Sequence, residues 1–405
     1  MQRPIYLDHH ATTPLDPRVL EAMLPYLREE FGNAASRTHE YGWRAEAAVE
    51  QAREEIAAAI GAREPREIIF TSGATESDNL ALKGLLRARR DRARELVLSA
   101  LEHPAVADTA EALGAEGFAV RTLPVDAGGL VDPATLEETL GDATGLVSVI
   151  WAQSEIGVVQ PVAELARRCR ERGVPFHSDA AQAVGKLSVD VERDGVDLLS
   201  FSAHKLYGPK GIGALYVRRG RPALRLEPLL HGGGHEWGLR SGSLPVMLIV
   251  GFAAALRIAL AERETEAERL AALRALLLER LRERLGGVLL NGDALRRLPG
   301  NLNLSIEGVP GDALVAGCPG LALSTGSACA SARPEPSPVL RALGLPAERV
   351  REGFRIGLGR GTREAEVLRA AEQIAAAAER IRAERLASPP PGRAASLPVS
   401  NPAGE

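Results

Sequence analysis

The sequence predicts an α/β protein in which helices cover both faces of a mostly parallel sheet. Between about residues 65 and 220, short apolar runs alternate with helical patterns, as they do in chains that form parallel sheets. A long helix rich in Ala, Leu, Glu and Arg, at roughly 244–285, then leads to a smaller unit. The chain has 405 residues, which is too many for one core of ordinary size, so two domains are expected.

Seven apolar runs are expected to be the strands of the large sheet. The last run closely follows its neighbour, which favours antiparallel pairing for that strand. Helical patterns such as Val106–Ala115 and Ala163–Arg172 lie between several of the runs. In chain order the runs are Ile68–Thr71, Leu96–Ala100, Val120–Val125, Leu146–Ala152, Val174–Ser178, Leu198–Ser202 and Ile212–Val217.

The smaller unit is expected to be of the α+β class. Its predicted strands are Val288–Leu290, Asn301–Ile306 and Leu321–Ser324, followed by a final helix at about 363–386. The last residues, 387–405, are rich in Pro, Ala, Ser and Gly. Such a composition cannot bury enough apolar surface to fold alone, so this tail is expected to be disordered.

Composition excludes several functional classes. The 45% of hydrophobic residues are spread in short runs, and none approaches the roughly 20 apolar residues of a membrane helix. The first residues lack the apolar core of a signal peptide. A net charge of −4 gives no electrostatic footprint for direct nucleic-acid binding. Three irregularly spaced cysteines form neither a disulfide framework nor a metal site, which favours a reducing cytoplasm.

The most informative stretch is Ser-Ala-His-Lys at 202–205, which follows a strand-like run and precedes a glycine-rich turn. Lys205 is therefore expected at the carboxyl end of a strand, where α/β sheets form their ligand crevices. Desolvation there lets a lysine lose its proton and form a Schiff base with a carbonyl. Pyridoxal 5′-phosphate (PLP) requires such a lysine, a carboxylate for its ring nitrogen and several phosphate donors.

The predicted carboxylate is Asp179, which ends the preceding strand-like run. A carboxylate against the ring nitrogen keeps that nitrogen protonated, so the ring can accept electrons. Gln182 is well placed to hydrogen-bond the phenolic oxygen of the ring. A lone Asp or Lys is more often simply exposed, and only the combination makes the cofactor site the better interpretation.

The predicted phosphate site follows the run Ile68–Thr71. A turn containing Gly73 leads into a helix that begins near Thr75, and the N–H groups of a helix start bind phosphate well. Ala74 and Thr75 stand at that start, and Gly73 allows close approach of the backbone. Ser202 and His204 can donate to the same phosphate.

Ten motifs in order along the chain resemble those of the IscS/NifS-type cysteine desulfurases, a group within the PLP-dependent class-V aminotransferase family. The resemblance runs from about residue 5 to about 385 and implies PLP-dependent fold type I. It also implies that the amino-terminal segment packs on the small domain, so that the large domain is 15–257 and the small domain is 1–14 with 258–386. The motifs are Leu7–Pro14, Phe31–Asn33, Thr71–Asn79, Glu102–His103, Glu155–Gln160, Ser202–Lys205, His231–His235, Arg240–Ser243, Ser324–Cys329 and Arg355–Arg360.

The resemblance implies that free L-cysteine displaces Lys205 from the cofactor, and that Lys205 then moves a proton between the substrate and the cofactor. His103 would stack on the ring and act as an acid or base, although a buried structural histidine is the alternative. Arg355 would hold the substrate carboxylate in a bidentate manner, and Asn33 would be a second substrate contact.

The residue before Glu155 is usually Asn in the family, and here it is Ser154. The family's Asn contacts the ring oxygen and the substrate. Ser154 is shorter, so it would act through a water molecule, or Gln153 would replace it, or the electronics of the cofactor would differ.

Cys329 is the predicted nucleophile, which as a thiolate attacks the substrate sulfur and retains it as a persulfide. The residues around it are small and polar, as expected of a loop that must move. The alternative is an ordinary surface loop whose thiol is unreactive. Cys169, in a helical run, is expected to be structural. Cys318, in the turn Ala316–Gly320, is expected to be structural or, less favoured, a sulfur relay.

The resemblance also implies partners. The hydroxyl of Ser243 would reach the phosphate site of a neighbouring subunit in a homodimer, which is also the commonest assembly. The sulfur acceptor would be an iron–sulfur scaffold protein, a tRNA-thiolation relay or another biosynthetic protein. A selenocysteine lyase or another class-V enzyme would share Lys205 and Asp179, and Cys329 favours the desulfurase.

Overall fold

A seven-stranded sheet forms the centre of the computed structural model, which describes residues 3–220, 223–326 and 336–387. Its strand order is β2-β8-β7-β6-β5-β3-β4, and β8 alone runs antiparallel to its two neighbours. The predicted parallel sheet and its antiparallel strand are therefore confirmed. The strands are β2 (Ile68–Thr71), β3 (Glu95–Ser99), β4 (Ala119–Leu123), β5 (Thr144–Ser148), β6 (Phe176–Asp179), β7 (Leu198–Ser202) and β8 (Gly213–Val217).

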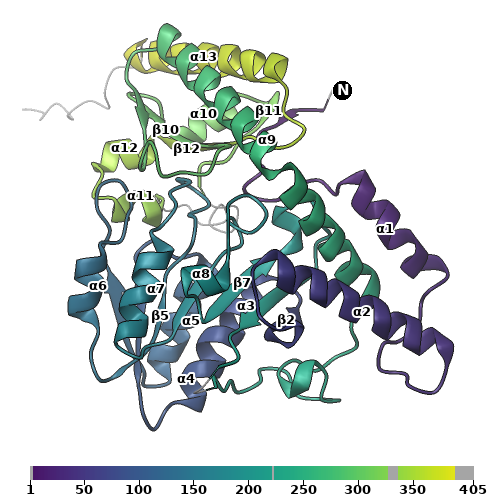
Figure 1. The fold of residues 1–405 in the computed structure, drawn as a ribbon. Coiled ribbons are helices and arrows are strands. Elements are labelled where there is room, and N and C mark those ends of the chain that lie inside the picture. Colours follow the sequence, from purple (N-terminus) through teal and green to yellow (C-terminus); the bar gives the residue numbers. More distant parts are fainter. Residues whose placement is uncertain (1–2, 221–222, 327–335, 388–405) are drawn as a thin grey trace, which may run out of the picture.

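Helices cover both faces of this sheet (Figure 1). Successive strand residues point to opposite faces. Leu96 and Leu98 of β3 therefore pack in the hydrophobic cluster that contains α5 (Pro104–Ala115), whereas Val97 packs in the cluster that contains α2 (Glu40–Ala59), α7 (Val162–Glu171) and the first half of α9 (Val246–Arg284). The helices of this part are α1 (Pro17–Arg28), α2 (Glu40–Ala59), α3 (Ala74–Asn79), α4 (Leu85–Ala88), α5 (Pro104–Ala115), α6 (Pro133–Thr139), α7 (Val162–Glu171) and α8 (Val191–Asp194), with a π-helical segment, Leu80–Gly84, joining α3 to α4.

The 39-residue helix α9 (Val246–Arg284) runs from the large part of the molecule to the small one (Figure 1). Its apolar residues up to Ala259 belong to the core of the large part, and those from Leu270 onward belong to a separate core. The two cores thus share one continuous helix, which fixes their relative position.

The small part contains an antiparallel sheet in the order β12-β10-β9 and a parallel pair, β1 with β11. Strand β12 contains Arg355. It was not predicted from the sequence, because the glycines at its two ends weaken the strand pattern. The elements are β1 (Ile5–Tyr6), β9 (Val288–Leu290), β10 (Asn301–Ile306), β11 (Leu321–Ala322), β12 (Gly353–Gly357), α10 (Gly311–Ala316), α11 (Pro338–Ala342), α12 (Ala347–Arg351) and α13 (Glu364–Ala387).

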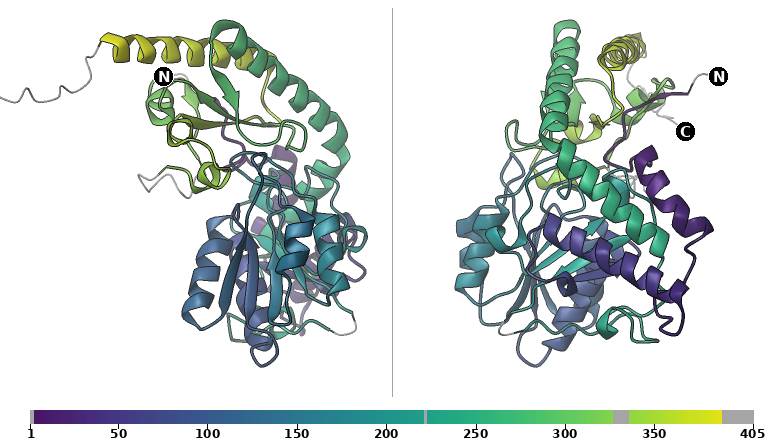
Figure 2. Two further views of the ribbon diagram at one scale, coloured as in Figure 1. Left: turned by 90° about the vertical axis from the view of Figure 1, so that its left-hand side faces the viewer. Right: turned by 45° about the vertical axis from the view of Figure 1, so that its right-hand side comes forward.

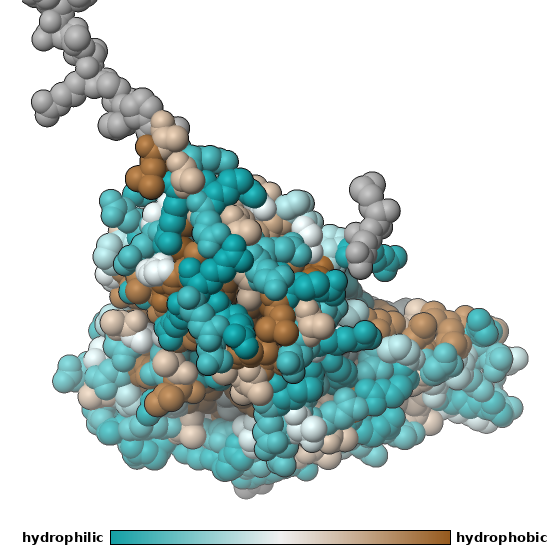
Figure 3. All heavy atoms as spheres, turned by 90° about the horizontal axis from the view of Figure 1, so that it is seen from above, coloured by the Kyte–Doolittle hydropathy of each residue, from teal (hydrophilic) through white to brown (hydrophobic). Residues whose placement is uncertain are grey.

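Two further views show α13 and the second half of α9 lying over the small sheets, away from the large sheet (Figure 2). From above, the surface of the small part is mostly hydrophilic with hydrophobic patches between, and the part formed by α1 and α2 projects to one side (Figure 3). Across residues 3–220, 223–326 and 336–387, no helix has both the length and the apolar character needed to span a membrane.

Candidate active site

Lys205 stands where the sequence predicts, directly after β7 in the short 3-10 turn Ala203–Lys205. Its Nζ donates hydrogen bonds to the carbonyl oxygens of His10 and Ala11, each at 2.7 Å. The amino-terminal segment therefore crosses over the carboxyl end of β7 and holds the lysine. This contact between residues almost 200 positions apart places the lysine between the two cores.

Asp179 ends β6, the neighbour of β7, and its buried carboxylate accepts a hydrogen bond from the backbone N–H of Ala181 at 2.9 Å. Burial raises the pKa of Asp179, while the nearby charges of His103 and Lys205 act in the opposite direction. The fold therefore brings Lys205, Asp179 and His103 together, as predicted. A cationic ring nitrogen beside Asp179 would supply the positive charge that this buried carboxylate needs.

His103 precedes α5 and caps it, because its Nδ1 accepts a hydrogen bond from the backbone N–H of Ala105 at 3.1 Å. Because Nδ1 is the acceptor in that bond, Nε2 is the ring nitrogen that carries a proton. The cap fixes the orientation of the imidazole and leaves Nε2 as its proton-carrying atom.

A layer of buried polar side chains lies behind Asp179, and its roles were missed from the sequence. His177 bonds Ser148 through Nδ1 at 2.8 Å and Ser200 through Nε2 at 2.9 Å, and burial lowers its pKa to about 3. Burial also raises the pKa of Asp78, and the charge of Asp179 raises it further. Burial therefore disfavours the charged forms of both His177 and Asp78 in this layer behind Asp179.

Glu102 belongs to the same neighbourhood. It accepts hydrogen bonds from the Ser99 hydroxyl at 2.5 Å and from the backbone N–H of Ile150 at 2.7 Å. Burial raises the pKa of Glu102 to about 8, so its carboxyl group is mostly protonated at neutral pH. Asp78 and Glu102 both lie within the quoted motifs, which was the only signal in the sequence for them.

The predicted phosphate donors converge around Gly213 of β8, which pairs with Thr71 on one side and with Ser202 on the other. A Cβ at Gly213 would lie 2.6 Å from the Cα of Gly73, so only glycine allows this approach. Gly73 itself adopts φ 157° and ψ 177°, a region open essentially to glycine alone. The start of α3, with Ala74 and Thr75, therefore lies near Ser202.

Ser202 is 1% exposed, and its hydroxyl has no hydrogen-bond partner among the residues that the structure describes. A buried hydroxyl without a partner is costly, and a phosphate at the start of α3 would satisfy it. His204 bonds the Thr12 hydroxyl through Nδ1 at 3.0 Å, and burial lowers its pKa to about 4, so the ring is neutral at pH 7. These residues fit the phosphate group of PLP.

Gln182 has partners that the sequence did not predict. Its Nε2 donates to the carbonyl oxygen of His10 at 2.8 Å, and its Oε1 accepts from Lys186 Nζ at 2.7 Å and lies 3.2 Å from His10 Nδ1. Burial, together with the charge of Lys205, lowers the pKa of Lys186 to about 7. The amide of Gln182 is therefore held with its oxygen toward Lys186 and its NH2 group toward the backbone that also binds Lys205.

Arg355 lies at the centre of β12 and is 1% exposed. Its Nη2 donates to Asp8 Oδ1 at 2.6 Å, and its Nη1 donates to the carbonyl oxygen of Ser154 at 3.2 Å. Within the described part of the chain, its Nε has no hydrogen-bond partner. The guanidinium is thus fixed by Asp8 and still has donor capacity for a substrate carboxylate.

Among the described residues, Ser154 takes part in the hydrogen bonds of this site through its backbone carbonyl, which accepts from Arg355. The Gln153 side chain closes its own turn: Oε1 accepts from the backbone N–H groups of Glu155 and Ile156, and Nε2 donates to Leu101 O. Its amide is therefore occupied, which argues against the alternative that Gln153 replaces the family's Asn.

Two predicted residues, Asn33 and Ser243, are not brought to Lys205 by the contacts of this chain that the structure describes. Asn33 is exposed between α1 and α2, and its Oδ1 accepts a local bond from Ala35 N–H at 2.9 Å. Ser243 is exposed at the end of the loop that precedes α9. Cys329 lies outside the described residues, but Ser324, shortly before it, forms a backbone bridge with Arg355.

The two other cysteines are buried. Cys318 packs in the core of the small part, its Sγ lies 3.8 Å from the carbonyl oxygen of Gln373, and burial raises its pKa. Burial likewise raises the pKa of Cys169. Both thiols are therefore protonated at neutral pH, which favours the structural role over a sulfur relay for Cys318.

Comparison with known proteins places this geometry in a family. Residues 5–369 match the model of the aminotransferase class-V family. The chain is 51% identical over 385 residues to "Cysteine desulfurase IscS" of Vibrio cholerae, covering 95% of each chain. It is 51% identical over 380 residues to "Cysteine desulfurase, mitochondrial" of Drosophila melanogaster, covering 94% of this chain and 82% of that one.

Solved structures of related proteins share the fold of this chain. A "NIFS-like protein" superposes with a TM-score of 0.86 at 36% identity, covering 92% of this chain and 98% of that one. A chain described as "SspA in complex with cysteine" superposes with a TM-score of 0.78 at 37% identity, covering 87% of this chain and 98% of the other.

Proposed function

Since the chain belongs to the class-V aminotransferase family, we infer that it is a PLP-dependent cysteine desulfurase, which converts L-cysteine to L-alanine and retains the sulfur as a persulfide. The observation that supports this inference most strongly is that one segment, at the amino terminus, binds both Lys205 and Arg355. The amino-terminal segment holds Lys205 through the His10 and Ala11 carbonyls and holds Arg355 through Asp8. Identity of about 50% to cysteine desulfurases over nearly the whole chain supports it.

PLP supplies an electron sink for the substrate carbon that loses its proton. Asp179 would hold the positive charge of the ring nitrogen, while Ser202, His204 and the start of α3, with Ala74 and Thr75, would hold the phosphate. Gln182 would face the phenolic oxygen with its NH2 group, since Lys186 occupies its carbonyl oxygen. We assign Ser154 to the ring-oxygen side through a water molecule.

The proton-transfer groups are Lys205 and His103. Lys205 would remove the proton from the substrate Cα once its amine is free of the cofactor. His103, with its proton on Nε2, would stack on the ring and donate or accept on the other face. Arg355 would bind the substrate carboxylate, which orients the Cα–H bond toward Lys205.

Sulfur transfer is assigned to Cys329. Its thiolate would attack the substrate sulfur, so that an S–S bond forms, the substrate C–S bond breaks, and its electron pair stays on the carbon that becomes the methyl group of alanine. A protein-bound persulfide then needs an acceptor, for which we propose an iron–sulfur scaffold protein or a tRNA-thiolation relay.

We further propose a homodimer. Apolar and aromatic side chains are exposed around the loop between α1 and α2 and the loop that contains Trp237: Phe31 is 70% exposed and stacks on Tyr41, and Trp43 and Trp237 are also exposed. Asn33 and His235 line one pocket beside Trp237. An exposed group of this kind is typical of an interface, and Ser243 would reach the phosphate site of the partner subunit across it.

The large domain is proposed to span 15–257, and the small domain 1–14 and 258–386. The predicted disordered tail, 387–405, lies almost entirely outside the described residues. A cytoplasmic location is proposed from the composition, although relatives include a mitochondrial enzyme.

The test combines a spectrum with a product assay. Purified protein with PLP should show the visible band of lysine-linked cofactor, and L-cysteine with a thiol reductant should give equal amounts of alanine and sulfide. Lys205→Ala should abolish the band, and Cys329→Ser should keep it but release no sulfide. Alanine without sulfide, or turnover of L-selenocysteine but not L-cysteine, would reject the proposal.

A further inference from the structure

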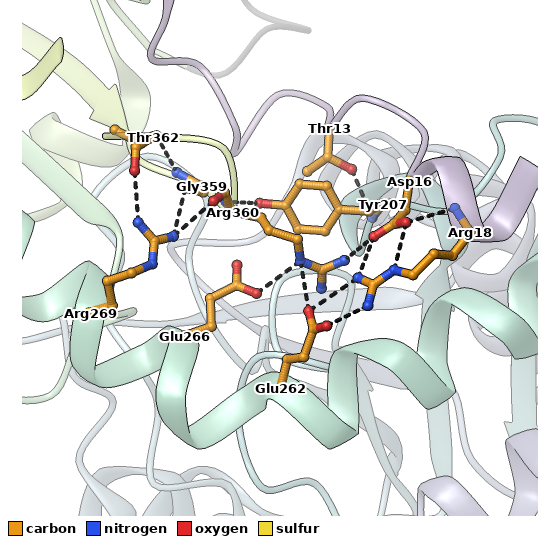
Figure 4. Close-up of polar contacts among 10 residues, drawn as sticks. All are labelled: Thr13, Asp16, Arg18, Tyr207, Glu262, Glu266, Arg269, Gly359, Arg360 and Thr362. Atoms are coloured by element: carbon orange, nitrogen blue, oxygen red, sulfur yellow. Dashed lines mark hydrogen bonds and ion pairs between the residues drawn. The ribbon is translucent and has the colours of Figure 1, made fainter. Parts of the chain in front are cut away.

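A cluster of polar side chains lies where the amino-terminal segment, the turn after Lys205, helix α9 and the end of β12 meet (Figure 4). Tyr207 and Arg360 are at its centre, and neither has a role in the proposed chemistry. The other members are Thr13, Asp16, Arg18, Glu262, Glu266, Arg269, Gly359 and Thr362. These residues come from both cores and from the segment that crosses between them.

Tyr207 lies just after the turn that contains Lys205 and has a left-handed backbone, with φ 66°. A bulky residue rarely adopts this conformation, and it persists only where its surroundings determine it. Its N–H donates to Thr13 Oγ1 at 2.8 Å, and its carbonyl oxygen accepts from Asp16 N–H at 3.0 Å. The amino-terminal segment therefore fixes the backbone of Tyr207 on both sides, and with it the turn that carries Lys205.

Arg360 contacts Tyr207 in two ways. Its backbone N–H donates to the Tyr207 hydroxyl at 2.5 Å, and its guanidinium lies 4.2 Å from the centre of the ring. The same guanidinium pairs with Asp16 at 2.7 Å and with Glu266 of α9 at 3.1 Å. Hydrogen bonds from Arg18 and from Arg360 hold the pKa of Asp16 well below its usual range, so these ion pairs persist at neutral pH.

Arg360 stands shortly after Arg355 in the segment that leaves β12. Arg269 of α9 fixes that segment further, because its guanidinium donates to the carbonyl oxygens of Gly359, Arg360 and Thr362. One contact, Tyr207 with Arg360, thus joins the turn of Lys205 to the strand of Arg355. Both residues also line the pocket between the two cores that His10 and Lys186 line.

We propose that the Tyr207–Arg360 contact is a positioning device that sets the carboxylate-binding Arg355 at its working distance from Lys205. The proposal rests on the proposed function, because it assumes that Lys205 carries the cofactor and that Arg355 holds the substrate carboxylate. The phosphate and ring-nitrogen partners of the cofactor lie on β7, α3 and β6 of the large sheet. Loss of the contact should therefore weaken binding of the substrate carboxylate by Arg355 and leave the affinity for the cofactor unchanged.

This arrangement predicts a difference between two ligands. L-Alanine, the product, presents an amine and a carboxylate, and ethylamine presents the amine alone. Both are followed by the change that they cause in the visible band of the lysine-linked cofactor, which requires no turnover. Because the two ligands differ only in the carboxylate, the ratio of their dissociation constants measures how much the carboxylate contributes to binding.

Three variants test separately the hydroxyl and the ring of Tyr207 and the guanidinium of Arg360. Tyr207→Phe keeps the ring beneath Arg360 and removes the hydroxyl. Tyr207→Asn keeps a residue that tolerates the left-handed backbone and removes both ring and hydroxyl. Arg360→Lys keeps the charge and removes the stacking and the fork of donors. Tyr216→Phe is the matched control, since Tyr216 is buried in β8 and its hydroxyl has no partner within the described residues.

Tyr207→Asn and Arg360→Lys should weaken L-alanine binding about tenfold or more, as expected when a charge-assisted hydrogen bond is misplaced. Tyr207→Phe should weaken it by about threefold, the loss of one neutral hydrogen bond. Ethylamine binding and the visible band should stay as in the unaltered protein in all three, and Tyr216→Phe should change neither ligand.

Equal weakening of L-alanine and ethylamine would overturn the proposal, because the contact would then only stabilise the fold. Unchanged L-alanine binding in Tyr207→Asn and Arg360→Lys would overturn it too. Failure of the proposed function is seen separately, as the absence of sulfide from L-cysteine in the unaltered protein.

Discussion

Replacing Glu102 with glutamine should make the stability of the protein less dependent on pH. Glu102 is buried beside Asp179, and its pKa is raised to about 8 from an ordinary value of 4.5. Glutamine has nearly the shape of the protonated carboxyl group and can still accept from Ser99 and from the backbone N–H of Ile150. The variant therefore imitates the neutral form at every pH.

The sign follows from proton binding. Between pH 4.5 and pH 8, the folded protein keeps the Glu102 proton and the unfolded chain has lost it, so the folded protein loses stability as the pH rises. At about 1.4 kcal/mol per pH unit, the loss reaches about 3 kcal/mol at pH 7 and about 5 kcal/mol above pH 8. Below pH 4.5 the stabilisation is fully present.

Urea unfolding from pH 5 to pH 9, followed by the fluorescence of the buried Trp151, measures this difference. Glu102→Gln should be close to the unaltered protein at pH 5 and more stable by several kcal/mol at pH 8. The matched control is Glu138→Gln, an exposed site on α6, which should follow the unaltered protein throughout. A difference between Glu102→Gln and the unaltered protein that stays constant from pH 5 to pH 8 would refute the raised pKa.

Two further predictions concern stability and sulfur transfer. Arg53 and Glu236 form an ion pair in which each side chain is 2% exposed, so Glu236→Gln should cost about 3–5 kcal/mol of unfolding free energy. Glu50→Gln, which removes the 49% exposed partner of Arg53, should cost at most about 1 kcal/mol, and equal costs would contradict this account. Cys318→Ser should release sulfide at a rate within about twofold of the unaltered protein, since its buried thiol forms little thiolate. A loss as complete as that expected for Cys329→Ser would instead make Cys318 a sulfur relay.

Much of the sheet could be predicted because strand and helix patterns are local. The predicted strands of the large sheet each overlap an observed strand, and the ends shift where tertiary pairing stops before the apolar run does, as at β5 (Thr144–Ser148). Strand β12 escaped prediction because Gly-Phe-Arg-Ile-Gly lacks a clear strand pattern. Its pairing with β10 overrides that weak local preference.

In the candidate site, too, some residues could be placed from the sequence and some contacts could not. Lys205, Asp179 and the turn at Gly73 could be placed from the sequence, because each follows a strand directly and parallel strands align their carboxyl ends. The partners of Gln182 could not, since Lys186 lies in the irregular turn that follows β6 and His10 comes from the amino-terminal segment. No local pattern specifies which distant backbone meets a buried amide.

The sequence by itself thus determined the strands of the large sheet, the chemistry of the strand ends and the family to which the chain belongs. Only the tertiary structure decided how Asp8 fixes Arg355, how His10 and Ala11 hold Lys205, and how Arg360 closes on Tyr207. The physical reason is that side-chain periodicity acts over a few residues, whereas these contacts join segments that are far apart in the chain. They form only when two separately packed cores and one crossing segment meet.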